Sequence, residues 1–365
     1  MGTCKLENIN KRFGDTVACD HVSFEVKDKE FQFMLGPSGA GKTTTLRILA
    51  GLEIPDSGRV FIDGKDVTDL PPEERPIAMV FQQAVLYPHM TVRENMEFPL
   101  KINKYPIKER INKINYIAKL VKIDHKLDQN VTTLSGGEMQ RAALGRLFVQ
   151  DASIYLMDEA LNWLDAKLKL LMRTEIKIWQ EKLGVTIISV THDQAEALSM
   201  GSSIILINDG VIQQEGSPYE IYNKPNNAWV ADFIGSPSMN FLLGTIEDDL
   251  YLRCYDARIP LSKKLNKDLN LKDLIGREVY VGFRPEEMDI FFGNEDKNLI
   301  NCVEVVAIEF EGHRTIIDLI DKQGKIIKYS INPKKNKLKK GDIVGIKWSE
   351  NMEILFDKDT GKRIC

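Results

Sequence analysis

Nine consecutive residues, Gly36-Pro37-Ser38-Gly39-Ala40-Gly41-Lys42-Thr43-Thr44, contain the phosphate-binding pattern G-x-x-x-x-G-K-[ST]. The apolar run Phe31–Leu35 precedes them and predicts a buried strand, and the pattern over Thr43–Leu52 predicts a helix that stops near Gly51. Strand, glycine-rich loop and helix in this order are typical of a phosphate site. We therefore expect these nine residues to contact the phosphates of a nucleotide.

The chemistry of this loop follows from its residue types. Glycines let successive backbone N–H groups point inward without a Cβ in the way, and a helix N-terminus adds roughly half a positive charge beneath the phosphates. Lys42 is expected to reach the β- and γ-phosphates, and the Thr43 hydroxyl to hold Mg²⁺. The alternative is a glycine-rich turn before an ordinary helix, which does not account for a lysine and a threonine at the required offsets.

The composition is that of an ordinary globular protein. The 365 residues are 43% hydrophobic and 28% charged, and the length suggests about two domains. The net charge of −4 argues against nucleic acid as the main partner, no run approaches the ~18 consecutive apolar residues of a membrane span, and the N-terminus lacks an apolar signal core. The five cysteines are far apart and form no C-x-x-C motif, which indicates reduced thiols in a cytoplasm.

Apolar runs alternate with helical patterns up to about residue 235. Strands are predicted at Cys4–Ile9, His21–Val26, Phe31–Leu35, Arg59–Ile62, Ile77–Phe81, Ile154–Met157, Val185–Val190, Ser203–Ile207 and Val211–Glu215. Further helices are predicted from a cap at Thr91 and Glu94 toward Leu100, and over Ile107–Ile123, Glu138–Val149 and Ala166–Leu183. This alternation indicates an α/β fold with a mostly parallel sheet.

The composition changes after Gly235-Ser236-Pro237. Short strand-like runs separated by turns follow, at Leu250–Tyr255, Glu278–Phe283, Cys302–Phe310, Thr315–Ile320, Ile326–Ile331, Ile343–Trp348 and Met352–Phe356. Short strands at this spacing predict a small β-barrel. We therefore expect an α/β domain over residues 1–235 and a small all-β domain over residues 236–365.

A second candidate anion site lies in Leu134-Ser135-Gly136-Gly137-Glu138. Ser135 can cap the helix that follows, and the two glycines expose backbone donors at its start. The alternative is a common S-G-G turn, but the long helical pattern after it favours the anion site.

Four polar side chains follow predicted strands, where open α/β sheets bind their ligands. Asp158 is expected to bind Mg²⁺ directly or through water, and Glu159 to act as general base on the attacking water. His192 is suited to orient that water at the γ-phosphate, and Gln82 to contact Mg²⁺ or the water. The alternatives are two solvated acids that end a strand and a structural histidine.

The sequence pattern allows two interpretations for each of two apolar features. Phe13 lies just before a predicted turn, where its ring either stacks on a nucleobase or packs locally. Leu86, Tyr87 and Met90 precede a helix cap, where they form either an exposed groove for a partner helix or part of the local core.

Together, these motifs resemble the ordered set of an ABC transporter ATPase subunit, a P-loop NTPase. They are Phe13, the phosphate loop, Gln82, Leu134-Ser135-Gly136-Gly137-Glu138, Asp158-Glu159, Leu164-Asp165 and His192. The resemblance implies that two ATP molecules lie in a head-to-tail homodimer, with a helical subdomain at roughly residues 84–150. Each ATP would contact the phosphate loop of one copy and Ser135, Gly136, Gly137 and Glu138 of the other, and Phe13 would stack on adenine.

A narrower resemblance is to the maltose/glycerol-3-phosphate type of carbohydrate importer ATPase. It rests on Leu86-Tyr87-Pro88-His89-Met90-Thr91-Val92, Asp165-Ala166-Lys167-Leu168, Thr191-His192-Asp193-Gln194-Ala195-Glu196-Ala197 and Phe233-Ile234-Gly235-Ser236-Pro237-Ser238-Met239-Asn240. Gly282-Phe283-Arg284-Pro285-Glu286 and Phe356-Asp357-Lys358-Asp359-Thr360-Gly361 are similar to the OB-fold-like regulatory domain of that family. The resemblance implies a peripheral protein on the cytoplasmic face of the membrane, where two copies dock near Leu86–Met90 on two permease subunits. An extracellular binding protein would deliver the solute.

The sequence departs from the family pattern in one segment. Ala160-Leu161-Asn162-Trp163-Leu164 stands where the family usually has Pro-Leu-Ser-Asn-Leu, so a bulky Trp163 joins Asp165 where two subunits are expected to meet. Four functions follow from these observations. They are an ATPase for carbohydrate import, one for another solute such as a polyamine, metal or anion, a soluble ABC protein outside transport, and a regulatory subunit with weakened hydrolysis.

Overall fold

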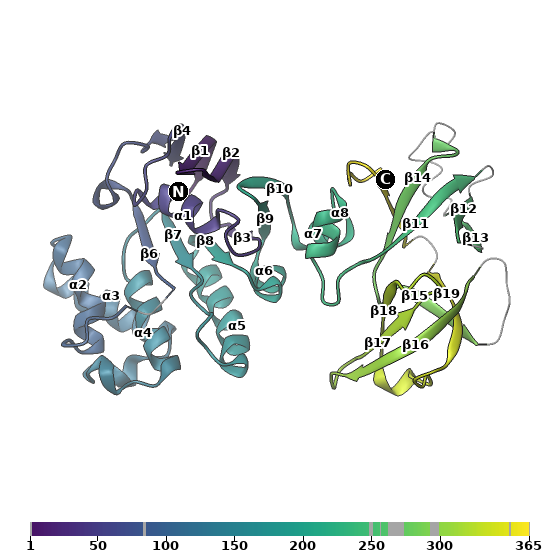
Figure 1. Ribbon diagram of the computed structural model, residues 1–365. Helices are drawn as coiled ribbons and strands as arrows, with labels where there is room; N and C mark the ends of the chain where they lie inside the picture. The colour runs from purple at the N-terminus through teal and green to yellow at the C-terminus, as the bar shows by residue number, and fades with distance from the viewer. Residues whose placement is uncertain are drawn as a thin grey trace. The chain divides into compact units, whose positions relative to one another are not determined.

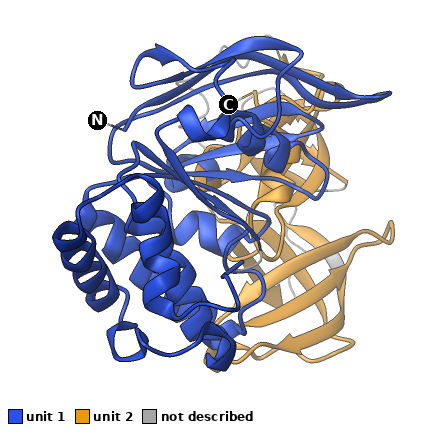
Figure 2. Ribbon diagram, turned by 90° about the vertical axis from the view of Figure 1, so that its left-hand side faces the viewer, with its two compact units in different colours: residues 1–221 blue, residues 222–365 orange. Residues whose placement is uncertain are grey.

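The computed structural model describes residues 2–82, 85–247, 251–255, 257–261, 274–292, 299–349 and 352–364. The chain divides into two compact units, Met1–Ile221 and Tyr222–Cys365 (Figure 2). Within the described residues, no helix is long and apolar enough to cross a membrane.

The first unit is built on a six-stranded sheet in the order β10-β9-β3-β8-β7-β6 (Figure 1). Its strands are β3 (Phe31–Leu35), β6 (Ile77–Val80), β7 (Ile154–Asp158), β8 (Thr186–Thr191), β9 (Ser203–Asn208) and β10 (Val211–Gly216). The pairings among β3, β6, β7, β8 and β9 are parallel, and β10 runs antiparallel to β9. Every residue of β3, β7 and β8 is buried, as parallel strands covered on both faces require. The predicted mostly parallel α/β sheet is confirmed.

A second, antiparallel sheet has the order β2-β1-β4-β5. Its strands are β1 (Cys4–Phe13), β2 (Thr16–Val26), β4 (Ser57–Ile62) and β5 (Lys65–Asp66). The first two strands are longer than predicted, because register shifts between Leu6 and Arg12 interrupt the regular alternation of buried and exposed residues. Side chains of both sheets and of α1 (Lys42–Ala50) share one hydrophobic core.

Two groups of helices belong to the first unit. α1, α5 (Ala166–Leu183) and α6 (Gln194–Met200) each connect strands of the sheets, whereas α2 (Val92–Ile102), α3 (Ile107–Leu120) and α4 (Gly136–Phe148) lie together between β6 and β7 in the chain (Figure 1). Short 3-10 turns also occur among the described residues of this unit, at η1 (Pro72–Glu74), η2 (Asp124–Lys126) and η3 (Val131–Thr133). The predicted capping box of α2 is confirmed, since the Glu94 N–H donates to Thr91 Oγ1 at 3.2 Å and the Thr91 N–H to Glu94 Oε2 at 2.8 Å.

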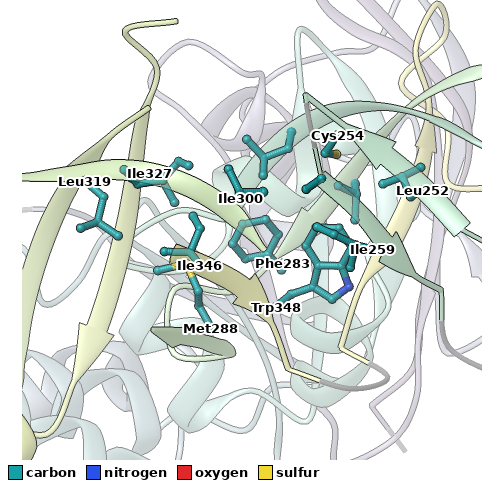
Figure 3. Packing of buried hydrophobic residues seen from close by; sticks show 14 of the residues in the cluster. Leu252, Cys254, Ile259, Phe283, Met288, Ile300, Leu319, Ile327, Ile346 and Trp348 are labelled. Carbon is teal, nitrogen blue, oxygen red and sulfur yellow. The ribbon is translucent and has the colours of Figure 1, made fainter. Parts of the chain in front are cut away.

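The second unit is mostly strand. The boundary between the units falls within α7 (Pro218–Asn223). α8 (Ala228–Phe233) precedes two antiparallel five-stranded sheets, ordered β13-β12-β11-β14-β20 and β15-β19-β16-β17-β18. The strands are β11 (Asn240–Glu247), β12 (Tyr251–Cys254), β13 (Ala257–Pro260), β14 (Glu278–Phe283), β15 (Met288–Phe292), β16 (Ile300–Phe310), β17 (Thr315–Ile320), β18 (Ile326–Ile331), β19 (Ile343–Trp348) and β20 (Ile354–Asp357). A 3-10 turn, η6 (Pro333–Lys335), precedes β19. Both sheets contribute to one core, in which Phe283 of β14 lies 5.7 Å from Trp348 of β19 between ring centroids (Figure 3).

The sequence patterns did not predict β11, β13 or β15. In β11 the apolar alternation is interrupted by Gly244, whose added Cβ would lie 2.8 Å from Cys254 Sγ and from Leu252 on the paired strand. The glycine therefore serves close packing across the strand pair, and it weakens the local strand signal for the same reason. The predicted strand at Leu250–Tyr255 is observed over Tyr251–Cys254, and Leu250 lies outside the described residues.

Arg284 connects β14 to the helical segment at the start of the second unit. The side chain is buried, and its guanidinium donates to the carbonyls of Tyr222 at 2.7 Å, of Ala231 at 3.0 Å and of Ile234. Burial lowers the pKa of Arg284, although the neighbouring acidic groups oppose that shift. Gly235 has a φ of +112°, and a Cβ there would lie 2.9 Å from Arg284 Nη1. Residues 222–235 thus pack around the Arg284 side chain.

We predict that R284A destabilises the second unit by about 3 kcal/mol, because two buried carbonyls and a half-buried one lose a charged donor. Urea unfolding followed by tryptophan fluorescence measures the effect. R277A, at an exposed position next to β14, is the matched control and is expected to stay within about 0.5 kcal/mol of the original chain. Equal unfolding midpoints for R284A and R277A would contradict the assignment.

Candidate nucleotide site

The phosphate loop connects the C-terminal end of β3 to the first turn of α1. Gly39 and Gly41 have φ values of +81° and +97°, which residues with a Cβ rarely adopt. A Cβ on Gly41 would lie 2.0 Å from the carbonyl oxygen of Ala18, and one on Gly36 would lie 2.1 Å from that of Ile207. Glycine is therefore required at positions 36 and 41 by contact with neighbouring backbone, and at position 39 by conformation alone.

Lys42 is the first residue of α1 and is only 5% exposed. Its ammonium donates to the carbonyls of Gly36 at 2.9 Å and of Pro37 at 2.7 Å. Burial lowers the pKa of Lys42, and the charges of Glu159 and Asp158 oppose that shift. The ammonium is thus held at the loop in a partly desolvated position, where a phosphate group would favour its charged form.

Thr43 faces the carboxylate that ends β7. Its hydroxyl donates to Asp158 Oδ1 at 3.3 Å, and Asp158 is 7% exposed. Burial raises the pKa of Asp158, the Thr43 bond opposes this, and the charge of Glu159 adds to it. A hydroxyl and a carboxylate are oxygen ligands that suit Mg²⁺ when substrate phosphates complete its shell, so the donor set fits that ion. Within the described residues no group of three His, Cys, Asp or Glu residues could hold a metal by itself.

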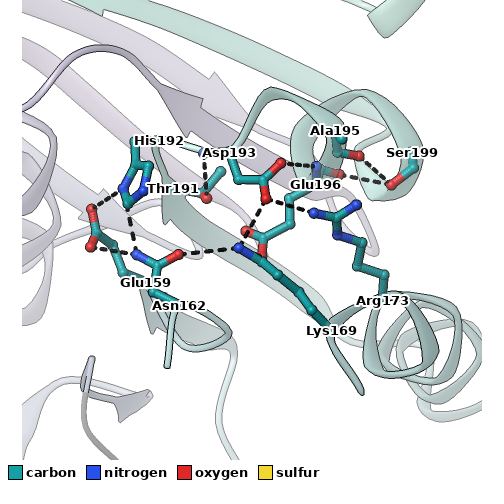
Figure 4. A network of polar contacts seen from close by, with 10 residues as sticks. All are labelled: Glu159, Asn162, Lys169, Arg173, Thr191, His192, Asp193, Ala195, Glu196 and Ser199. Atoms are coloured by element: carbon teal, nitrogen blue, oxygen red, sulfur yellow. Dashed lines mark hydrogen bonds and ion pairs between the residues drawn. The ribbon is translucent and has the colours of Figure 1, made fainter. Parts of the chain in front are cut away.

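Glu159 lies at the centre of a polar cluster (Figure 4). Its Oε2 accepts hydrogen bonds from Gln82 Nε2 at 3.0 Å and from Asn162 Nδ2 at 2.6 Å, and its Oε1 lies 3.2 Å from His192 Nδ1. The backbone of Glu159 has a φ of +47°, and its N–H donates to the Val190 carbonyl at 3.0 Å. The left-handed turn therefore aims the carboxylate at the residues that follow β6 and β8.

The structure brings most of the predicted site residues together. The six residues all lie at or just beyond the carboxyl ends of the parallel strands β3, β6, β7 and β8: Lys42, Thr43, Gln82, Asp158, Glu159 and His192. Hydrogen bonds join Thr43 to Asp158 and join Glu159 to Gln82 and His192. An acceptor carboxylate beside an imidazole, next to a phosphate loop, can activate and orient water for attack on a phosphorus atom.

The second predicted anion site lies at the start of α4. Ser135 is the N-cap of α4 and forms a capping box with Glu138. The Glu138 N–H donates to Ser135 Oγ at 3.4 Å, and the Ser135 N–H donates to Glu138 Oε2 at 2.9 Å. These bonds lower the pKa of Glu138, and Lys126, 3.3 Å away, adds to the shift. The Glu138 carboxylate therefore caps the start of its own helix.

An open pocket of about 400 Å³ lies beside this helix start, and no residue of the phosphate loop lines it. It is lined by Ser135, Gly136, Gly137, Glu138, Arg141, Trp163, Leu164, Asp165 and Leu168. A Cβ on Gly136 would lie 3.0 Å from Trp163 Cζ3, so the indole packs on that glycine while remaining 38% exposed. Asp165 caps α5 by accepting the Leu168 N–H at 3.0 Å. The two predicted anion sites are thus separate within one chain.

Phe13 ends β1 at the tip of the hairpin with β2, and its ring is 49% exposed. The Lys11 ammonium lies 5.2 Å from the ring centroid. An exposed ring at a hairpin tip offers a face to a flat ligand.

The segment Leu86–Met90 is partly core. Leu86 is only 9% exposed, so of the two alternatives for this residue the structure favours the local core. The buried Asn95 accepts the Tyr87 N–H at 2.7 Å and donates to its carbonyl at 3.2 Å, which holds the segment against α2. Tyr87 instead lines an open groove of about 290 Å³ with Met79, Phe81, Val85, Phe98, Pro99, Ile102, Arg146 and Gln150.

Sequence reasoning missed Lys169 and Arg173 on α5. Lys169 lies 3.5 Å from Asn162 Oδ1 and 2.9 Å from Asp193 Oδ2, and Arg173 lies 2.6 Å from the same Asp193 oxygen (Figure 4). Their spacing of four residues on a predicted amphipathic helix indicated a shared face, but nothing local showed what that face meets.

Two family models match the chain. The model described as ABC transporter matches residues 19–162, and the one described as MalK OB fold domain matches residues 235–288. The fold and the site therefore define an ATP-binding cassette ATPase with a C-terminal OB-fold domain.

Relatives and solved structures agree. The chain is 42% identical to the trehalose/maltose import ATP-binding protein MalK of Thermococcus litoralis and 40% identical to the oligosaccharides import ATP-binding protein MsmX of Bacillus subtilis, over 100% of each chain. It is 38% identical to the xylose/arabinose import ATP-binding protein XacJ of Haloferax volcanii, over 100% of this chain and 96% of that one. This chain belongs to the family of ABC transporter ATP-binding proteins. The dimeric ATP-binding cassette MJ0796 bound to ADP and Pi matches with a TM-score of 0.53 and 33% identity, over 59% of this chain and 98% of that one.

We predict that G41A impairs ATP binding far more than G39A. Both changes place a Cβ at positive φ, at a cost of about 1 kcal/mol, but only the Gly41 Cβ also collides with the Ala18 carbonyl. Fluorescent ATP-analogue binding and thermal unfolding compare the two variants. Equal affinities would show that contact with β2 does not shape the loop.

Proposed function

We propose that this chain hydrolyses ATP to drive carbohydrate import through partner permeases. The observation that carries the proposal is the Glu159 carboxylate held between Gln82, Asn162 and His192, next to the phosphate loop. The names of the relatives, which import trehalose, maltose, oligosaccharides, xylose or arabinose, support a sugar or a related compound such as glycerol 3-phosphate as the solute.

In this proposal each residue of the cluster has one task. The loop N–H groups and Lys42 bind the β- and γ-phosphates of ATP, Thr43, Asp158 and Gln82 would hold Mg²⁺, and that ion would neutralise the phosphate charge. Glu159 accepts the proton of the attacking water. His192 orients that water and stabilises the charge that develops on the γ-phosphate.

A head-to-tail homodimer completes the site. The pocket at Ser135–Glu138 contains no residue of its own phosphate loop, which supports a contact of these residues with the ATP of a second copy. Trp163 and Asp165 line the same pocket, which supports their assignment to the dimer interface. Phe13 stacks on adenine through its exposed ring. Dimeric structures of a related cassette support this arrangement.

Two permease subunits are the membrane partners in this proposal, and an extracellular binding protein supplies the solute. The groove beside Tyr87 fits a short permease helix, because it is lined mainly by apolar side chains and lies next to Leu86–Met90. The chain would therefore act at the cytoplasmic face of the membrane as a peripheral subunit. Residues 1–235 form the ATP-binding part, with residues 84–150 as its helical subdomain, and residues 236–365 form the regulatory part.

Besides the regulatory subunit with weakened hydrolysis, two alternatives remain from the sequence. The same machinery would serve an importer of a polyamine, metal or anion, because the solute does not contact the ATPase. A soluble ABC protein outside transport is the other, and the full-length match to import proteins argues against it.

We predict that E159Q binds ATP with unchanged affinity but loses at least 100-fold in turnover, because the amide cannot accept the proton of water. Size-exclusion chromatography with Mg-ATP should then show a stable dimer, and phosphate release should fall to background. Turnover that persists in E159Q would exclude Glu159 as the base.

We predict that I102E weakens permease docking without lowering the ATPase rate of the isolated chain. Ile102 lines the groove and is 63% exposed, so a charge there opposes burial by an apolar helix. Co-purification from membranes should recover several-fold less permease with I102E. I107E, on α3 and 66% exposed, is the matched control outside the groove. Equal recovery with both variants would place the docking surface elsewhere.

A further inference from the structure

Asn162 contacts three members of the polar cluster, and the proposed ATPase mechanism gives this residue no role so far. Its Nδ2 donates to Glu159 Oε2 at 2.6 Å and lies 3.5 Å from His192 Nδ1, while its Oδ1 faces the Lys169 ammonium at 3.5 Å (Figure 4). One amide therefore touches the carboxylate, the imidazole and a cation at once.

The chemistry of the neighbours determines which way this amide points. An ionised carboxylate only accepts hydrogen bonds and an ammonium only donates them. The Asn162 NH₂ group must therefore face Glu159, and its carbonyl oxygen must face Lys169. A flipped amide would place its oxygen against the Glu159 carboxylate and its NH₂ against the Lys169 ammonium, which is repulsive on both sides.

Lys169 is itself held in place from the far side. Its ammonium lies 2.9 Å from Asp193 Oδ2 and 3.4 Å from Glu196 Oε1, and Arg173 bonds to the same Asp193 oxygen at 2.6 Å. Burial alone would raise the pKa of Asp193, but the Lys169 hydrogen bond and the Arg173 charge outweigh burial and hold it below its usual range. Asp193 also caps α6 through the Glu196 N–H at 3.2 Å. The cation facing Asn162 is thus anchored to the start of α6.

We propose that Asn162 is a positioning residue for the general base, and that Lys169 orients the Asn162 amide for this task. This inference rests on the proposed function, in which Glu159 is the base. Asn162 and Gln82 both bond to Oε2, so together they hold the carboxylate plane and leave Oε1 directed toward His192 and the attacking water. Through Lys169 and Asp193, the aim of Glu159 depends on α5 and on the start of α6.

A double-mutant cycle on the full chain tests the proposal through the ATPase rate and ATP affinity. N162A is expected to lower kcat about tenfold to a hundredfold, the range for losing one hydrogen bond to a charged group, while the Kd for ATP stays within about twofold. K169M is expected to lower kcat about fivefold, and K169R to recover most of that loss. K167M, at an exposed lysine of the same helix, is the control and is expected to leave both values unchanged.

The decisive result is the coupling between the two changes. If Lys169 acts through the amide, K169M has little further effect on kcat in the N162A background. If the two losses multiply, or if N162A raises the Kd for ATP as strongly as it lowers kcat, the proposal is overturned and Asn162 is only a structural residue. The proposed function fails separately, through an inactive original chain or an active E159Q.

Discussion

The site depends on backbone contact between the phosphate loop and strands distant in sequence. Gly41 lies against the carbonyl of Ala18 in β2, and Gly36 lies against that of Ile207 in β9. The Gly210 N–H donates to the Ala40 carbonyl at 3.1 Å, which ties the loop to the turn after β9. No side chain separates these backbones, so the loop conformation is set by the packing of both sheets. The positions of Lys42 and Thr43 follow from that packing, because both begin the helix that the loop starts.

Burial then prepares the site electrostatically. Desolvation lowers the pKa of Lys42 and raises that of Asp158, so each group is held where its charged form is disfavoured. A phosphate beside the ammonium and a divalent cation beside the carboxylate would reverse both effects at once. The free energy spent on burying these groups during folding is therefore recovered when a nucleotide and its metal ion bind together. Binding of the nucleotide together with its metal ion is therefore favoured over binding of either one alone.

Local motifs allowed much of the site to be predicted from sequence, and tertiary contacts account for what was missed. The phosphate loop, Ser135 and the Thr91 cap were predictable because residue type and spacing within one segment determine them. Lys169 and Arg173 were not, since their partners belong to the loop before α5 and the start of α6. Strand β11 was missed, and the two alternatives for Leu86 stayed open, for the same reason: each depends on a neighbour that the local pattern does not contain.

Asn162 and Trp163 are consecutive residues that face different parts of the molecule. Asn162 bonds to the candidate base Glu159, whereas Trp163 packs on Gly136 at the start of α4. The Asn162 N–H donates to the Glu159 carbonyl at 3.2 Å, and the Leu164 N–H donates to the Leu161 carbonyl at 3.2 Å. These hydrogen bonds fold residues 159–164 into consecutive tight turns. A shift of the indole along α4 would therefore move the amide that bonds to Glu159. Under the proposed function, the ATP of a second copy in the Ser135 pocket would in this way affect the position of the base through adjacent residues of one turn.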